Sequence, residues 1–420
     1  MHRNQPPSNW KINFYTFLTG QFLTAVTSTV VQYAIIWYLT QKTGSATILS
    51  LAVLFGMMPT VLFSSFVGPL VDRLNKKLVL ILSDLVVAAF ALILALVGWL
   101  SGTFPMSFVF IVILIRATAQ AFQMPTVQSM LPTMVPASEI TRVNGQFGMV
   151  QAMNLVVAPA LGIFLFSVIP IHWLILVDVI GAIIGTALLF KLKIEKVVSQ
   201  GEEIHLFHDT KEGFKLLYQN KGIWYMTLIL GATLLFLVPG MSLFPLITIE
   251  HFGGSLIDAG WVEVVFGLGT VVGGAIIGFF AKIKNRVLPL MLSIVIQGIF
   301  FALIGLMAGN RTGFIAFLIF TAIIGLANPF ASAMELAMVQ QSYQPQYLGR
   351  VMGVMLSIIS LAGPLGMLFT GPLADQIGIQ NIFVIGGIGT IFCGLSLVGI
   401  SKIRNYDIAL QNKIKVEEKQ

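Results

Sequence analysis

Long apolar runs separated by short polar breaks dominate the chain. Each run is about 20 residues long, the length that an α-helix needs to cross the hydrocarbon core of a bilayer. The first set covers 13–39, 46–70, 78–100, 105–126, 143–168 and 172–192. After a charged stretch, the second set covers 223–249, 256–281, 287–308, 313–334, 350–370 and 379–401. The pattern predicts an all-α membrane protein with 12 transmembrane helices.

Charged segments predict how these helices are grouped. We expect an N-terminal six-helix half over 1–192, a cytoplasmic linker over 193–221, a C-terminal six-helix half over 222–402 and a cytoplasmic tail over 403–420. Cytoplasmic loops retain Lys and Arg, whereas translocated loops do not. Of the 24 Lys and Arg residues, only Lys42, Arg311 and Arg116 fall outside the predicted cytoplasmic side. Both termini of this multi-pass protein are therefore predicted to be cytoplasmic.

Short matches between the two halves indicate an internal duplication. Arg142–Gly145 opens the fifth run, and the similar Arg350–Gly353 opens the eleventh run 208 residues later. Pro159 and Pro364 follow these openings and lie 205 residues apart. Proline removes a backbone donor inside a helix and kinks it. We therefore expect kinks at equivalent places in two pseudo-symmetric halves, where they would suit a gate.

Composition excludes several classes of protein. Hydrophobic residues make up 57% of the chain and charged residues 10%, whereas a soluble domain has about 25% charged residues. The net charge of +7 comes from basic residues between apolar runs rather than on one face, which argues against a nucleic-acid partner. The single cysteine, Cys393, permits no intrachain disulfide and no thiolate metal cluster. The sequence has no Gly-x-x-x-x-Gly-Lys-Ser/Thr loop for ATP, and we expect no cofactor and no enzymatic activity.

The segment between the second and third runs resembles a known signature. Gly68, Asp72, Arg73, Lys76 and Lys77 match the glycine, the Asp-Arg pair and the basic positions of the signature loop of the major facilitator superfamily. The resemblance implies the major facilitator fold, in which two halves rock about a substrate site at the midplane. It also implies that these five residues form a conformational latch at a cytoplasmic helix end.

Other stretches are similar to the macrolide efflux proteins, which are drug exporters of Gram-positive bacteria. They lie at 42–46, 219–222, 243–252 and 347–351. The similarity implies a bacterial secondary transporter that exports an amphipathic drug, with macrolides first, in exchange for protons. One alternative is a transporter of the same fold for a siderophore, a lipid or a sugar. Another is a membrane subunit that acts with a separate ATPase, a partner that the main interpretation does not require.

Ionisable residues inside the apolar runs are the candidates for proton coupling. Arg116 lies about ten residues from either end of the fourth run, where a charge is costly unless it is paired or solvated. The intramembrane acids are Asp84, Asp178 and Glu263, and Glu335 lies close to a cytoplasmic end. A carboxylate that alternates between an apolar surrounding and an arginine can load and release a proton. The sequence does not select one acid, and each of these residues also has a purely structural interpretation.

Polar residues of the first run recur on one helix face. Gln21, Thr24, Ser28 and Gln32 are spaced by three, four and four residues. With polar residues of later runs, they are candidates to line a substrate cavity. The later set is Gln120, Gln123, Gln151, Asn154 and Asn328. The alternative is that these side chains form hydrogen bonds between packed helices.

Overall fold

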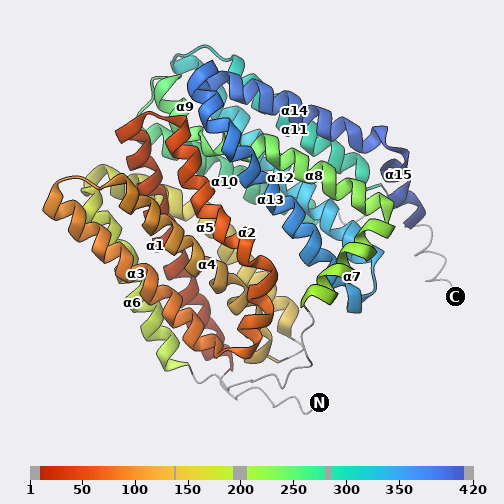
Figure 1. The fold of residues 1–420 in the computed structure, drawn as a ribbon, viewed down its shortest axis with the longest axis horizontal. Coiled ribbons are helices and arrows are strands. Elements are labelled where there is room, and N and C mark those ends of the chain that lie inside the picture. Colours follow the sequence, from red (N-terminus) through yellow and green to blue (C-terminus); the bar gives the residue numbers. More distant parts are fainter. Residues whose placement is uncertain (1–9, 137–138, 193–205, 280–284, 411–420) are drawn as a thin grey trace. The chain divides into compact units, whose positions relative to one another are not determined.

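The regular secondary structure of the described residues is α-helix. The computed structural model describes residues 10–136, 139–192, 206–279 and 285–410 (Figure 1). The first helices are α1 (Trp10–Thr43), α2 (Ala46–Arg73), α3 (Lys76–Ser101), α4 (Met106–Met134), α5 (Ile140–Val168), α6 (Ile171–Lys191) and α7 (Leu206–Gln219). The later helices are α8 (Lys221–Ser242), α9 (Phe244–Glu250), α10 (Leu256–Phe279), α11 (Val287–Leu306), α12 (Arg311–Ser342), α13 (Pro345–Ile377), α14 (Ile379–Gly399) and α15 (Ser401–Arg404). Twelve of these are long and apolar enough to cross a membrane, which confirms the predicted fold class and span count.

The seventh predicted span differs from the structure at its end. The apolar run 223–249 divides into α8 and the short helix α9, with Leu243 between them outside helical geometry. Pro245 lies in the first turn of α9, where its missing N–H would have interrupted a continuous helix. The charged stretch before this run also contains the helix α7, which the pattern of long apolar runs did not reveal.

The chain packs into two compact units. One unit contains residues 1–39 and 55–204, and the other contains residues 40–54 and 205–420. The first unit has a core around Phe14, Phe17 and Met130. The second has a core around Ile223 and Met338. The hairpin 40–54 therefore packs with the second unit although it belongs to the first sequence repeat.

Helix neighbours repeat between the two units. In the first unit, α3, the third span, packs on α4 and α6. In the second unit, α11, the ninth span, packs on α12 and α14, which are the tenth and twelfth spans. This equivalence agrees with the duplication seen in the sequence. Pro159 lies inside α5 and Pro364 inside α13, and their role in a gate stays a prediction.

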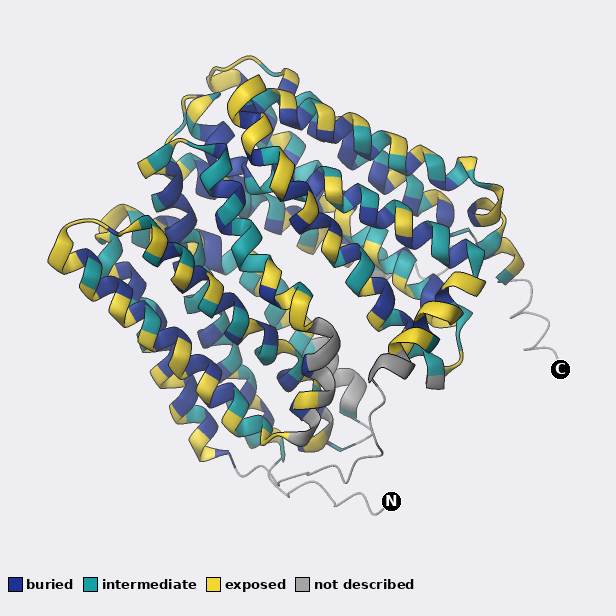
Figure 2. Ribbon diagram, in the orientation of Figure 1, coloured by how far each residue is buried: buried dark blue, intermediate teal, exposed yellow. Residues whose placement is uncertain are grey.

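Glycines let helices of the second unit approach closely. A side chain at Gly269 or Gly273 of α10 would collide with the backbone of α12, at Ala322 and Leu326 respectively. Gly274, one residue further along, has no other atom within 4 Å of the place of a side chain. Figure 2 shows that single helices carry both buried and exposed positions.

A buried ion pair fastens the predicted C-terminal tail to the second unit. Asp407 accepts bonds from the backbone N–H of Arg286 at 2.7 Å and from its Nε at 2.9 Å. Both residues are buried, with Asp407 at 0% exposure. Asp407, which lies in the predicted cytoplasmic tail, thus holds the start of α11.

Candidate functional site

Arg116 lies in a buried polar cluster of the first unit. Its side chain is 1% exposed and forms an ion pair with Asp178 of α6, which is equally buried. Its Nη2 also donates to the backbone carbonyl of Ser28 at 2.9 Å and to the Ser28 hydroxyl at 3.0 Å. An intramembrane arginine needs such acceptors. The structure therefore joins α1, α4 and α6 through one guanidinium.

A second buried acid lies close to this ion pair. Asp84 of α3 is 2% exposed and accepts a hydrogen bond from the side-chain amide of Gln123 through Oδ1. Its Oδ2 is buried and has no hydrogen-bond partner among the described residues. The charge of Asp178 acts on Asp84, so the two acids repel each other when both are ionised. Asp84 thus combines burial, a repelling neighbour and an unpartnered oxygen.

The charges of this cluster do not balance when every group is ionised. Arg116 contributes one positive charge, whereas Asp178 and Asp84 contribute two negative charges. An unbalanced charge in a low-dielectric site is costly, and taking up one proton removes it. Because Arg116 pairs with Asp178, Asp84 is the acid of this cluster for which the described residues show no ion pair.

The other predicted acids lie in the second unit. Glu335 of α12 has a buried carboxylate oxygen with no hydrogen-bond partner in the described part of the chain. Glu263 lies half-buried on α10. Neither residue belongs to the cluster around Arg116, and their proposed part in proton coupling stays a prediction.

Two of the four residues of the predicted polar stripe form hydrogen bonds within the first unit. Ser28 accepts from Gln120 at 3.4 Å as well as from Arg116. Thr24 donates within its own helix to the carbonyl of Gly20 at 2.9 Å. These contacts resemble helix packing more than an open lining.

The remaining polar candidates have varied surroundings. Asn154 of α5 donates to the hydroxyl of Thr29 at 3.0 Å, and Gln151 lies 3.6 Å from the sulfur of Met124. Both amides therefore link neighbouring helices. The other three candidates are Gln21 and Gln32, half-buried on α1, and Asn328, exposed on α12. Their contact with a substrate stays a prediction.

The predicted latch residues separate into two groups. Gly68, Asp72 and Arg73 lie along α2, but their side chains fall outside the described residues. Lys76 donates to the carbonyl of Ser129 at 3.1 Å, which links α3 to α4. Lys77 donates to the carbonyl of Leu192 at 2.9 Å and so caps the end of α6. The two lysines thus have structural partners within the first unit, and the latch itself stays a prediction.

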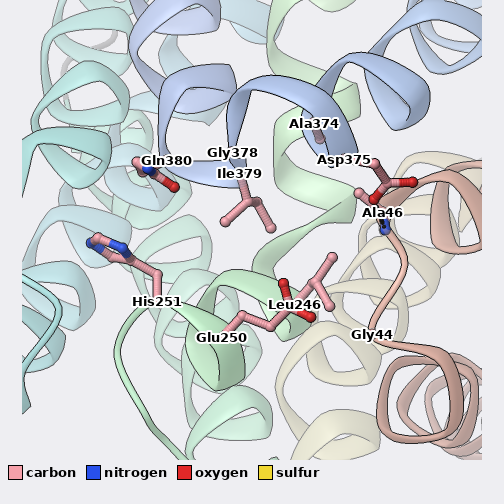
Figure 3. A pocket seen from close by; sticks show the side chains of 10 residues that line it. All are labelled: Gly44, Ala46, Leu246, Glu250, His251, Ala374, Asp375, Gly378, Ile379 and Gln380. Carbon is pink, nitrogen blue, oxygen red and sulfur yellow. Dashed lines mark hydrogen bonds between the residues drawn. The ribbon is translucent and has the colours of Figure 1, made fainter.

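A polar cavity of the second unit was not anticipated from the sequence. It has a volume of about 310 Å³, and Glu250, His251 and Asp375 are among its lining residues (Figure 3). The carboxyl groups of Glu250 and Asp375 lie toward the end of the cavity where Gly44 and residue 46 are found. No motif in the sequence pairs Glu250 with Asp375, which lie far apart along the chain.

Comparison with known proteins agrees with this architecture. The sequence profile described as Major Facilitator Superfamily matches residues 17–248 and 238–414. The chain belongs to the Major Facilitator Superfamily. The transporter is 34% identical over 403 residues to Macrolide efflux protein A of Streptococcus pyogenes, covering 96% of this chain and 99% of the relative. It is 33% identical to Macrolide efflux protein A of Enterococcus faecalis, with 77% of this chain and 100% of the relative covered.

More distant relatives show the same fold. Multidrug efflux pump Tap of Mycolicibacterium fortuitum is 24% identical over 389 residues, covering 89% of this chain and 92% of the relative. The crystal structure of the nucleoside transporter NupG covers 92% of this chain and 98% of its own chain, with a TM-score of 0.70 at 16% identity. A bacterial homologue of the lysosomal transporter Spinster, in an inward-facing conformation, has a TM-score of 0.65 at 16% identity and covers 98% and 99% of the two chains. These two structures support the major facilitator fold.

Proposed function

We propose that this transporter exports an amphipathic drug, with macrolides as the first candidates, in exchange for protons. The observation that carries the substrate class is the 34% identity to Macrolide efflux protein A, which extends over nearly the full length of both chains. The relatives from Streptococcus and Enterococcus favour a Gram-positive cell membrane as the location. The basic loops favour cytoplasmic termini.

The buried cluster of the first unit supplies a group for proton coupling. In this proposal Asp84 carries the proton, while Arg116 pairs with Asp178 and joins three helices. Proton uptake removes the surplus negative charge and so favours one arrangement of α3 relative to α4 and α6. A ligand drives a conformational cycle only by binding one state better than the other. Drug and proton therefore favour opposite states.

Substrate binding is assigned to polar and apolar side chains at the midplane. Ser28 accepts hydrogen bonds from both Gln120 and Arg116. A drug that contacts Ser28 or Gln120 would therefore alter the hydrogen bonding of Arg116. The 18 Met and 32 Phe residues of the chain suit a large and variable apolar cargo, because flexible and aromatic side chains adapt to many shapes.

The experiment that tests this function measures drug accumulation in cells. A sensitive bacterium that expresses the transporter alone is incubated with a radiolabelled macrolide, with and without a protonophore. We expect reduced accumulation that the protonophore restores. Unchanged accumulation at verified membrane expression would reject macrolide export by this chain alone. A siderophore, lipid or sugar screen and co-expression with an ATPase would then identify the alternative.

A further inference from the structure

Asp375 caps a helix to which it is remote in sequence. Its carboxylate accepts from the backbone N–H of Ala46 at 2.8 Å and of Thr47 at 3.2 Å, which are the first residues of α2. The hydroxyl groups of Ser45 and Thr47 donate to the same carboxylate at 3.1 and 2.5 Å. The first turn of α2 has no acidic residue of its own. A carboxylate at a helix N-terminus satisfies free N–H groups and interacts favourably with the helix dipole.

This contact joins the two sequence repeats inside one compact unit. Asp375 lies in the last turn of α13 in the second repeat, whereas the hairpin 40–54 comes from the first repeat and packs with the second unit. Rocking of the halves of a transporter rearranges contacts between its repeats. The predicted topology places this hairpin on the extracellular side, because Lys42 lies outside the basic loops.

A second carboxylate lies against the hairpin. Gly44 has a φ of +57°, and a Cβ at this position would lie 2.8 Å from Oε1 of Glu250. Burial, and then the negative charge of Asp375, raise the pKa of Glu250 above its ordinary value. Ionised Glu250 and ionised Asp375 therefore repel each other across the turn that Asp375 holds.

Few other charged groups belong to the elements around Glu250 and Asp375. The remaining titratable group of the cavity is His251, whose Nε2 lies 2.9 Å from the carbonyl oxygen of Met307. Of the helices that pack on α9, α8 has only Lys221 at its far end and α14 has no charged residue, whereas α10 has two acids. These acids are Asp258, paired with Arg311 of α12 at 2.9 Å, and Glu263. Lys42 lies near the end of α1 and Arg350 near the start of α13. The other charged residues of α1 and α2 are Lys11 at the start of α1, and Asp72 and Arg73 at the end of α2.

We propose that Asp375 and Glu250 form an outer latch, in which Asp375 holds the start of α2 and Glu250 controls closure through its own protonation. Four donors satisfy ionised Asp375 in the closed latch. Neutral Glu250 permits this arrangement, and ionised Glu250 opposes it. The part that the latch plays in the transport cycle rests on the proposed function, whereas the contacts that form the latch do not.

The sign of the pH effect follows from the pKa of Glu250. Because closure raises this pKa, proton binding stabilises the closed latch. The stabilisation is fully present below the ordinary pKa of glutamate and is lost as the pH rises through the raised value. An acidic exterior therefore closes the outer latch and returns the transporter to the state that accepts drug from inside. This direction is the one that export in exchange for protons requires.

Hydrogen exchange of the full chain in lipid nanodiscs tests the latch without any substrate. The measured amides are those of 46 and 47, which Asp375 caps, after correction for intrinsic exchange. We expect Asp375→Asn to accelerate their exchange about tenfold, because bonds to a charged acceptor are lost. In the unchanged chain, exchange should accelerate as the pH rises from below the ordinary pKa of glutamate through the raised pKa of Glu250. Glu250→Gln should slow it and remove this dependence.

Two controls separate the latch from general loosening. Asp258→Asn removes another carboxylate at a helix start and should leave these amides unchanged. The amide of Gly313, capped by Asn310 at 2.9 Å, serves as an internal reference in every variant. If exchange of the Gly313 amide also accelerates in Asp375→Asn, the deciding variant is Thr47→Val, which removes only a hydroxyl donor. Unchanged exchange in the deciding variant, or retained pH dependence in Glu250→Gln, would overturn the proposal whether or not the chain exports macrolides.

Discussion

Removing the positive charge of the buried cluster is the most informative perturbation of the first unit. Arg116→Gln keeps a long polar side chain but leaves Asp178 ionised and without its cation. The double variant Arg116→Gln/Asp178→Asn removes both charges and retains side chains that can form hydrogen bonds. The two variants therefore separate the charge balance of the cluster from its packing.

The expected magnitude follows from burial. Both partners are 1% exposed, and leaving one member of a buried pair without the other costs about 3–5 kcal/mol. For a unit of this size, such a loss lowers the midpoint of thermal unfolding by about 10 °C. The double variant should recover most of this loss, because neutral residues in place of a buried pair are often tolerated.

The assay heats each purified variant and measures the fraction that remains monodisperse by size-exclusion chromatography. Arg311→Gln is the matched control, since Arg311 pairs with Asp258 but is 70% exposed. An exposed pair contributes less than about 1 kcal/mol, so the control should change the midpoint little. A double variant as unstable as Arg116→Gln would refute the charge argument. A double variant that still transports under a proton gradient would refute the role of the pair in coupling.

Two further predictions concern the second unit. Asp407→Asn should destabilise the protein by about 3–5 kcal/mol, because it leaves the buried Arg286 unpaired; limited proteolysis should then release the C-terminal segment faster, and unchanged protection would contradict the prediction. Gly269→Val should lower the thermal midpoint, because overpacking costs about 1–3 kcal/mol, whereas Gly274→Val on the open face of α10 should not; equal effects of the two variants would contradict the packing of α10 on α12.

The hydrophobic pattern was sufficient to predict the helices because each span must satisfy its backbone internally. It missed the break at Leu243, where Pro245 rather than polarity ends the helix. It also missed α7, whose mixed polar and apolar sequence lacks a long apolar run. Local rules of turn chemistry outweigh hydropathy at such places.

The candidate site was predictable only in part. The cost of an intramembrane charge identified Arg116, and the structure selected Asp178 from the available acids as its partner. Sequence spacing could not make that selection, because α4 and α6 meet through tertiary packing. The contact of Asp375 with the start of α2 could not be predicted from the sequence either, because its partners lie more than 300 positions away. Long-range pairs leave no periodic signal in a single sequence.

Transport by purified protein tests the central claim most directly. The transporter and its Asp84→Asn variant are reconstituted in liposomes, and uptake of a radiolabelled macrolide is followed under an imposed pH gradient and in its absence. The account predicts that the unchanged chain accumulates drug against its gradient only when the pH gradient is present. It predicts that Asp84→Asn still exchanges drug downhill but no longer responds to the pH gradient. Accumulation by the variant equal to that of the unchanged chain would contradict proton coupling through Asp84.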